Sequence, residues 1–339
     1  MLCVAVGQAE RRGVIDVRVV RATRFGGPEV LVPGEAPEPV AGPGQVVVDV
    51  SVAGITFVET QIRRGVDKWH DRPALPYVPG GTVAGQVGSV GEGVDPSWSG
   101  RRVLADVGET GGFAERAVAV VQNLIPVPDG LRLPEATALH TDGGTALGLV
   151  EGARILPGEW VLVEAAGGGV GTLLVQLVRA AGARVVGAAR GARKLEMVRD
   201  LGADAAVDYS DPDWAKQVCE ATGGAGPDVV FDGVGGAIGQ AAFEVTAVGG
   251  RFSVHGASSG HVTEIDPAQA RRRGVEVIGI EQLFGFGPKM RGWAERVMSE
   301  AAAGRIQPII GQTFPLERAA DAHATIESRS ALGKTLLLI

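Results

Sequence analysis

A glycine-rich run, AAGGGVG at 165–171, follows the apolar segment WVLVEA and precedes the amphipathic stretch TLLVQLVRAAG. In this order of strand, turn and helix, Gly168, Gly169 and Gly171, with Val170 between them, would let backbone N–H groups approach a pyrophosphate. The N-terminus of the following helix adds positive potential. The spacing departs from a strict G-x-G-x-x-G, because position 166 is alanine. The run predicts a dinucleotide site, and the alternative is a glycine turn without a ligand.

Basic residues occupy the position, after the glycine run, that distinguishes NADH-binding from NADPH-binding units. In an NAD-binding unit, an Asp or Glu about 20 residues past the glycines binds the ribose hydroxyls. That position holds no acid here, and Arg190, Arg193 and Lys194 offer cationic donors to a 2′-phosphate. The pattern predicts NADPH as the cofactor. The alternative is that these basic residues are solvated at a helix start.

Short apolar segments alternate with longer helical stretches from Trp160 onward, which is typical of βαβ units. Two of the helical stretches end at Gly182 and Gly202, as helices often do. The pattern predicts a doubly wound parallel sheet of the Rossmann type, with strands at 160–165, 183–189, 204–209, 228–234, 250–256 and 275–280.

The segments on either side of this sheet have a different composition. Before it, β-branched runs such as 46–53 and clusters of Gly, Pro and Asp predict an irregular β barrel or sandwich. After it, a helix, a Pro-interrupted segment and the apolar ending TLLLI should pack back on the first domain. The first 17 residues should be a disordered extension or the product of an upstream start, without a catalytic role. We therefore expect an α/β protein with an extension at 1–17, a β-rich domain at 18–139, a dinucleotide-binding domain at 140–280 and a C-terminal return at 281–339.

Composition and charge exclude several classes of protein. The chain has 339 residues and a net charge of −7, and it lacks a basic, aromatic-rich patch, which argues against a nucleic-acid partner. No stretch is long and apolar enough to span a membrane, and the N-terminus makes a poor signal peptide. Because Cys3 and Cys219 are the only cysteines, no disulfide framework is expected, and the protein should be cytoplasmic.

The same two cysteines cannot build a thiolate-rich metal site. The histidines are scattered without an H-x-x-x-H pair, so structural or surface roles are favoured over metal ligation for His70, His140, His255, His261 and His323. No metal site is therefore predicted. Neither a Ser-His-Asp triad nor a pair of catalytic carboxylates is indicated.

Motifs spread over nearly the whole chain resemble those of one family. They are FGGPEVL (25–31), GITFVETQIRRG (54–65), GGTVAGQVGSVGEGV (80–94), AAGGGVG (165–171), LGADAAVDY (201–209), VFDGVGG (230–236) and the closing ESRSALGKTLLLI. Together and in this order, they are similar to those of the zinc-free quinone oxidoreductases related to zeta-crystallin, in the medium-chain dehydrogenase/reductase superfamily. The resemblance implies a GroES-like catalytic domain, a nucleotide domain, an active-site cleft between them and a homodimer.

The resemblance also implies roles for particular residues. Lys194 and Tyr209 resemble the family's pair at the 2′-phosphate, and Arg329 resembles a third contact from the C-terminal segment. Thr145 resembles a threonine beside the nicotinamide. The alternatives are an ordinary strand tyrosine, a surface arginine and a helix-interior threonine. Two further positions fall where the family lines the cofactor with backbone: Val234 and Gly256.

Three positions near the expected substrate depart from the family's pattern. Relatives commonly have Asn, Asp and Tyr where this chain has Thr56, Glu59 and Gln61. Thr56 and Gln61 can still hydrogen-bond a carbonyl oxygen. The segment PYVPGGTVAG (76–85) occupies the place of the metal-ligand motif of zinc-dependent relatives and has neither His nor Glu.

Without a Lewis acid, the substrate must accept hydride readily, as a quinone or a conjugated carbonyl does. Quinone reduction needs little acid from the protein, because water protonates the product. Enone reduction needs a proton on carbon, for which Tyr77 is the candidate donor. The leading hypothesis is an NADPH-dependent, zinc-independent quinone oxidoreductase with Thr56, Gln61 and Thr145 as catalytic residues. The alternatives are an enone or enoyl reductase and a non-catalytic NADPH-binding protein with a structural or RNA-binding role.

Overall fold

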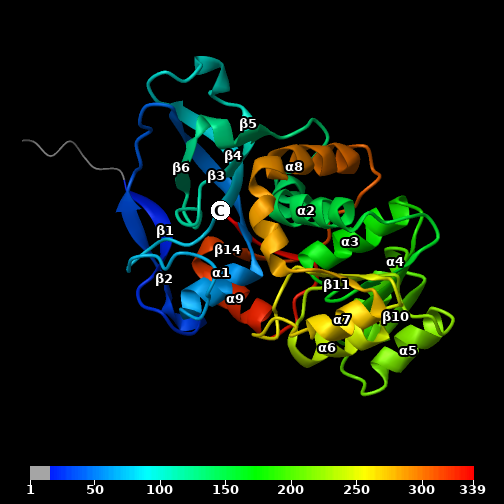
Figure 1. The fold of residues 1–339 in the computed structure, drawn as a ribbon. Coiled ribbons are helices and arrows are strands. Elements are labelled where there is room, and N and C mark those ends of the chain that lie inside the picture. The colour runs from blue at the N-terminus through cyan, green and yellow to red at the C-terminus, as the bar shows by residue number, and fades with distance from the viewer. Residues whose placement is uncertain (1–15) are drawn as a thin grey trace, which may run out of the picture.

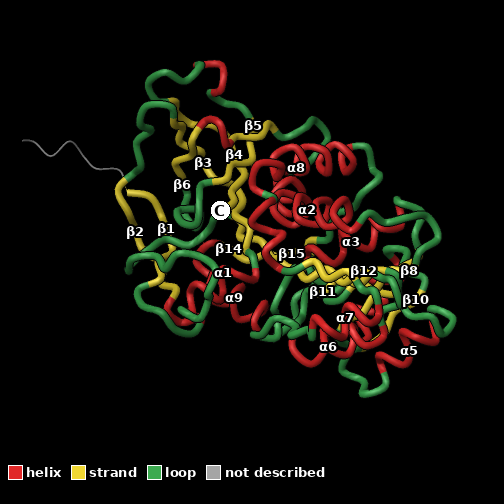
Figure 2. The backbone as a smooth tube through the Cα atoms, in the orientation of Figure 1, coloured by secondary structure: helices red, strands yellow, loops and turns green. Residues whose placement is uncertain are grey.

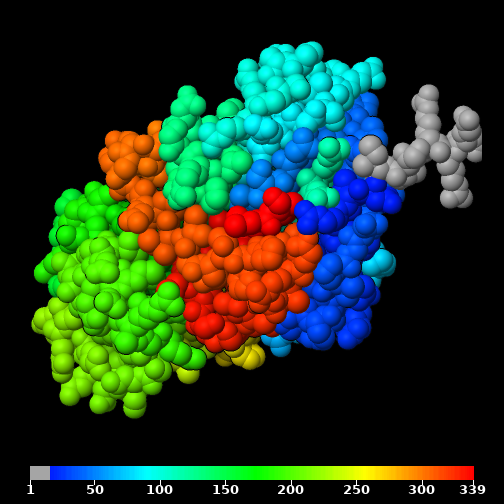
Figure 3. Space-filling model, turned by 180° about the vertical axis from the view of Figure 1, so that it is seen from behind, coloured from blue at the N-terminus to red at the C-terminus, as the bar shows by residue number. Residues whose placement is uncertain are grey.

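Residues 16–339 are described by the computed structural model, which places a β-rich region beside a parallel-sheet region (Figure 1). Residues 1–15, most of the predicted extension, lie outside the described residues. The other two residues of that extension, Asp16 and Val17, begin strand β1 (Asp16–Ala22) and are therefore part of the fold. In the space-filling view, segments from the last part of the chain lie between the two regions (Figure 3).

Parallel strands form the sheet of the parallel-sheet region, in the order β10-β9-β8-β11-β12-β13. The predicted doubly wound arrangement is confirmed. The order reverses between β8 and β11, where Val163 lies opposite Phe231, and open α/β sheets bind ligands at such a point. The bounds are β8 (Trp160–Val163), β9 (Arg184–Ala189), β10 (Ala205–Asp208), β11 (Val229–Asp232), β12 (Arg251–Val254) and β13 (Glu276–Ile278).

Helices cover both faces of this sheet, because alternate strand residues point to opposite sides. Val161 and Val163 pack with residues of α2 (Leu133–Ala153), α3 (Gly169–Ala180), α4 (Ala192–Asp200) and α8 (Gly287–Ala302). Leu162 packs on the other side with residues of α5 (Trp214–Ala221), α6 (Gly236–Val245) and α7 (Pro267–Arg273). The predicted domain boundary at 139/140 falls inside α2.

Among the described helices, none combines the length and the apolar character needed to cross a membrane.

The β-rich region is built around a sheet in the order β14-β15-β3-β4-β5-β7, with β6 paired to β3. Its strands are β3 (Gln45–Ile55), β4 (Thr82–Val90), β5 (Arg102–Asp106), β6 (Arg116–Val120), β7 (Leu124–Pro126), β14 (Ile310–Pro315) and β15 (Lys334–Leu338). β1 pairs with β2 (Leu31–Pro37) in a separate sheet. Val46, Val48 and Val50 lie in the core of this region, which agrees with their alternation in the sequence.

The end of the chain completes the β-rich sheet. β15 pairs antiparallel with β3, and β14 lies parallel to β15. α9 (Ala319–Glu327) packs near α1 (Phe57–Arg64), whereas α8 packs chiefly on α2. Figure 2 shows the strands of both sheets in yellow among the red helices. Short 3-10 helices occupy Pro28–Val30, Pro96–Trp98, Val121–Asn123, Ile280–Gly285 and Leu316–Arg318.

The outer edge of β13 suggests how two copies of the chain could associate. Within residues 16–339, β13 pairs only with β12, and Val277 is 40% exposed. An open strand edge is a ready site for pairing with another chain. We expect a dimer in sedimentation velocity. Val277→Lys should shift the dimer to monomer, because dimerisation would then bury the lysine charge at the β13 edge. Val40→Lys, at a position 85% exposed in the β-rich region, is the matched control and should leave the dimer intact. A monomeric unmodified protein at micromolar concentration would contradict this expectation.

Candidate functional site

The glycine turn connects β8 to α3 at the carboxyl edge of the parallel sheet. A Cβ on Gly171 would lie 2.3 Å from the carbonyl oxygen of Ala165, so a side chain has no room there. Ala165 itself has the left-handed φ of the turn, 48°, so the glycines serve close approach rather than a positive φ. Gly168 caps α3, which begins at Gly169 and continues with the half-buried Val170. The first N–H groups of a helix have no acceptor within it, so this end of α3 can bind an anion.

Four of the residues predicted at the 2′-phosphate lie together beside this turn. The stem of Lys194 covers Gly167, where a Cβ would be 2.9 Å from the lysine Cδ. The Lys194 Nζ donates to the carbonyl oxygen of Arg329 at 2.6 Å. The guanidinium carbon of Arg190 lies 5.9 Å from the ring centre of Tyr209. Burial lowers the pKa of Lys194, and the positive charges of Arg329 and Arg190 lower it further.

Arg329 reaches this group from the C-terminal return. It adopts a left-handed backbone conformation with φ of 62°. Its guanidinium carbon lies 4.5 Å from the ring centre of Phe57, and the guanidinium also donates to the carbonyl oxygen of Ser258. Burial lowers the pKa of Arg329. The side chain therefore joins α1 of the β-rich region to the loop after β12.

Arg193 is the one basic residue of the run that stays apart from this group. It is exposed on α4, and its side chain makes no hydrogen bond or ion pair with any residue that the structure describes. Neighbouring helix residues point about 100° apart, so Lys194 faces the turn while Arg193 faces away.

The loops after β11 and β12 touch each other, and both carry a predicted cofactor residue. A Cβ on Gly256 would lie 2.7 Å from the carbonyl oxygen of Gly233, so only glycine permits this contact. Val234 is buried, and its N–H donates to Oδ1 of Asp232 at 3.0 Å. Val234 and Gly256 thus lie at the carboxyl ends of neighbouring strands, next to the reversal of strand order.

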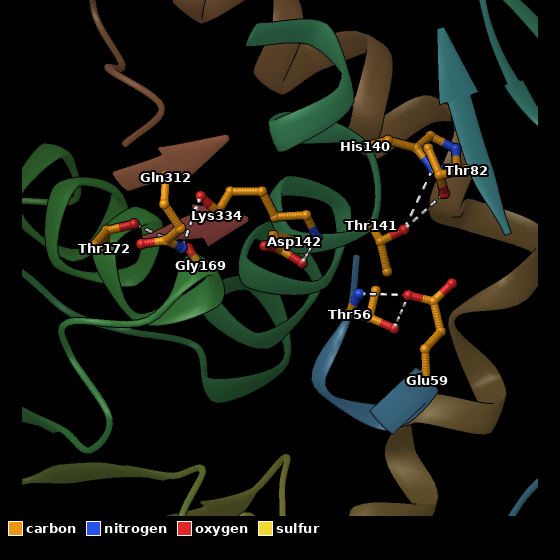
Figure 4. Close-up of polar contacts among 10 residues, drawn as sticks. All are labelled: Thr56, Glu59, Thr82, His140, Thr141, Asp142, Gly169, Thr172, Gln312 and Lys334. Carbon is orange, nitrogen blue, oxygen red and sulfur yellow. Dashed lines mark hydrogen bonds and ion pairs between the residues drawn. The ribbon is translucent and has the colours of Figure 1, made fainter. Parts of the chain in front are cut away.

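A buried ion pair, which no sequence motif indicated, lies beside the glycine turn (Figure 4). The Lys334 Nζ is 2.9 Å from Oδ1 of Asp142, and the two side chains are 6% and 10% exposed. A Cβ on Gly169 would lie 2.0 Å from Oδ2 of Asp142. The pair therefore ties β15 and α2 to the first residue of α3.

The three residues predicted to be catalytic are all half-buried and come from two helical segments. Thr56 precedes α1, and its hydroxyl donates to Oε2 of Glu59 at 3.1 Å. The Gln61 side chain donates to the hydroxyl of Thr60 at 3.0 Å. Thr145 lies on α2, one turn after the aspartate of the ion pair. A substrate carbonyl would therefore compete with bonds that Thr56 and Gln61 already make.

Glu59 has a structural role at the start of α1. It accepts the N–H of Thr56 at 2.6 Å and the N–H of Gly81 at 3.1 Å. Burial raises the pKa of Glu59, and these hydrogen bonds oppose that rise. A threonine three residues before a glutamate is the pattern of a capping box, so the sequence did carry a signal for this role.

Two threonines and a histidine form a further polar group near Thr56, which the sequence did not assign (Figure 4). The Thr82 hydroxyl lies 3.2 Å from Nδ1 of His140 and 3.3 Å from the hydroxyl of Thr141. Burial lowers the pKa of His140 to about 4, so its ring is neutral at neutral pH. Tyr77 lies instead in the core of the β-rich region, where burial raises its pKa to about 12.

Within residues 16–339, no group of three or more His, Cys, Asp or Glu side chains is arranged to hold a metal ion. Of the two cysteines, Cys219 is half-buried, and Cys3 lies outside the described residues.

Comparison with known proteins matches both regions of the chain. Residues 42–129 match the family model of the alcohol dehydrogenase GroES-like domain, and residues 169–285 match that of zinc-binding dehydrogenase. Quinone oxidoreductase of Rattus norvegicus is 32% identical, covering 95% of this chain and 98% of the relative. A mycobacterial protein complexed with NADPH is 30% identical with a TM-score of 0.85. The structure of Escherichia coli quinone oxidoreductase complexed with NADPH is 28% identical, with a TM-score of 0.87. Each of these two structural matches covers 95% of this chain and 100% of the relative's chain.

The GroES-like region, the Rossmann sheet and the glycine turn define a dehydrogenase/reductase of the medium-chain type. The chain belongs to the quinone oxidoreductase family of the medium-chain dehydrogenase/reductase superfamily. It is therefore an oxidoreductase, and the predicted family and fold class are confirmed.

The ion pair leads to a prediction about stability. Lys334→Met should lower the free energy of unfolding by about 3–5 kcal/mol, because it leaves the buried Asp142 charge without its partner. The double variant Lys334→Met with Asp142→Asn should recover much of that loss, since the unpaired charge is gone. Urea unfolding followed by tryptophan fluorescence measures both. Lys216→Met, at an exposed ion pair on α5, is the control and should change stability little. Equal losses in the single and double variants would contradict the argument.

Proposed function

We propose that this protein transfers a hydride from NADPH to a quinone and needs no zinc to do so. The observation that carries the cofactor assignment is the group of Arg190, Lys194 and Arg329 beside the glycine turn, without ion-pair partners among the described residues. Gathering like charges is unfavourable until an anion neutralises them. The 2′-phosphate, which NADH lacks, is such an anion. The NADPH complexes of two structural relatives support the same assignment.

The described residues fit this cofactor. The N-terminus of α3 would hold the pyrophosphate, and the three cations with Tyr209 would surround the 2′-phosphate. Val234 and Gly256 would line the cofactor at the reversal of strand order. When bound, NADPH supplies the hydride. The role of the protein is to orient the hydride acceptor and to exclude water from the reacting groups.

The side chains near the expected substrate favour a quinone over an enone. The reduced oxygens of a quinone take protons from water, whereas an enone needs a proton placed on carbon. Tyr77 is only 9% exposed and weakly acidic, and His140 is neutral, so neither is a suitable donor at neutral pH. We assign Thr56, Gln61 and Thr145 as hydrogen-bonding groups for the acceptor.

Zinc independence rests on the residues that the chain offers. The segment 76–85 has no His or Glu in the place of the ligand motif, and only two cysteines occur in the sequence. The proposal includes a homodimer that works in the cytoplasm, with no nucleic-acid or membrane partner.

The cation group predicts a preference for NADPH over NADH. Arg190→Ala combined with Lys194→Ala should weaken NADPH binding at least about tenfold, because each charge-assisted contact contributes about 1.5–3 kcal/mol. NADH binding should hardly change. Titration of both cofactors by fluorescence measures these affinities. Arg193→Ala is the matched control, since this arginine lies outside the group. Equal affinity of the unmodified protein for NADPH and NADH would overturn the assignment.

The substrate assignment predicts the effect of one hydroxyl. Thr56→Val should lower kcat/KM for a quinone by roughly twofold to tenfold, the effect of one neutral hydrogen bond, and should leave NADPH affinity unchanged. Thr56→Ser keeps the hydroxyl and should retain the activity. The assays compare quinones with enones, in the presence and absence of a metal chelator.

Two outcomes would contradict this part of the proposal. Faster turnover of enones than of quinones, abolished by Tyr77→Phe, would establish the enone reductase instead. Activity lost to the chelator, together with stoichiometric zinc in the purified protein, would exclude zinc independence.

A further inference from the structure

Two carboxyl groups lie side by side inside the parallel-sheet region, at the reversal of strand order. Glu164 follows β8 and Asp232 ends β11, and both are fully buried. Val163 lies opposite Phe231 in the register of these strands, and the N–H of Glu164 continues the ladder to the carbonyl oxygen of Phe231 at 3.0 Å. Residues in register on adjacent strands point to the same face, so the two carboxyl groups are neighbours.

The hydrogen bonds of the two groups are unequal. Asp232 accepts the N–H groups of Val234 and Gly235 at 3.0 and 2.7 Å, and the hydroxyl of Thr263 as well. Neither oxygen of Glu164 accepts a hydrogen bond from a described residue. An ionised carboxylate in this position would be buried without any donor, which costs far more than burying a neutral acid. A protonated Glu164 instead has one O–H to donate, and the Asp232 carboxylate is beside it.

The surroundings supply no positive charge to relieve two carboxylates. No Lys or Arg of the described residues forms an ion pair with Glu164 or Asp232. The titratable groups that face the pair are His255, after β12, and Tyr209, after β10. Burial lowers the pKa of His255 to about 4 and raises the pKa of Tyr209, so both are neutral at neutral pH. Burial, and next the charge of Asp232, raises the pKa of Glu164 well above its ordinary value.

We propose that Glu164 is a positioning residue for the cofactor: a neutral acid whose O–H donates a hydrogen bond to the Asp232 carboxylate and so fixes the loop that begins at Gly233. Asp232 holds this loop through two N–H groups, and Gly233 in turn contacts Gly256 after β12. The shared proton thus connects the glycine turn, which follows Glu164 directly, to both loops that would line the dinucleotide. The inference rests on the proposed binding of NADPH at this edge of the sheet.

The protonation of Glu164 makes the free energy of unfolding depend on pH in a definite direction. The folded protein keeps the proton on Glu164, whereas the unfolded chain releases it above a pKa of about 4.5. The folded state therefore binds more protons above that pH, and the free energy of unfolding contributed by this group falls as pH rises. Glu164→Gln keeps an N–H donor for Asp232 and cannot titrate, so it should remove this contribution to the pH dependence.

The decisive measurement is the infrared carbonyl band of a protonated carboxylic acid in the cofactor-free protein at neutral pH. The band should be present in the unmodified protein, lost in Glu164→Gln and kept in Glu244→Gln, which alters an exposed glutamate of α6. Glu164→Gln should bind NADPH as the unmodified protein does, while Glu164→Leu, which removes the donor, should bind it about tenfold more weakly.

The outcomes separate this inference from the proposed function. Absence of the band, or its survival in Glu164→Gln, would overturn the shared proton even if NADPH binds. Equal NADPH affinity in the Leu and Gln variants would overturn the positioning role. A band lost in Glu164→Gln, in a protein that fails to bind NADPH, would support the proton assignment and exclude the proposed cofactor.

Discussion

Contact between the end of the chain and the glycine turn holds the candidate site together. The N–H of Gly333 donates to the carbonyl oxygen of Gly167 at 2.8 Å, and the next residue, Lys334, forms the buried ion pair with Asp142. β15 belongs to the β-rich sheet and the turn to the parallel sheet, so this contact sets how the two sheets meet. It also brings Arg329 to Lys194. Without it, Arg329 would lie apart from Arg190 and Lys194, which both stand between the end of β9 and the first turn of α4.

Features encoded within short segments could be predicted from the sequence. The strands of the parallel sheet appear as apolar runs between helical stretches, and right-handed crossovers then restrict their order. The glycine turn is equally local, because its strand, its turn and its helix are contiguous. Arg190 and Lys194 are found by their distance from that turn. The family resemblance added Tyr209 and Arg329, which no local pattern connects to Arg190 and Lys194.

Features that join distant segments could not be predicted in this way. Asp142 and Lys334 are 192 positions apart, and neither segment indicates that its charge is buried against another. Arg193 and Lys194 are adjacent and both basic, and only the direction of each side chain on α4 separates them. Thr56 has a pattern compatible with two roles, a helix cap and a hydrogen-bonding group for a substrate. The bond to Glu59 reveals the first role, whereas the second depends on a ligand.

The order of strands along the chain determines when each region can be completed during synthesis. β3 and its partner β15 are separated by the whole parallel sheet. Because a ribosome releases the N-terminal part first and domains generally fold as units, the parallel sheet can form while the β-rich sheet still lacks β14 and β15. The part of β3 that pairs with β15, residues 52–55, then stays open at one edge until the last residues emerge, and an open edge can pair with other chains. The newly made protein thus completes its β-rich sheet, and the contact between β15 and the glycine turn, only with the final strand.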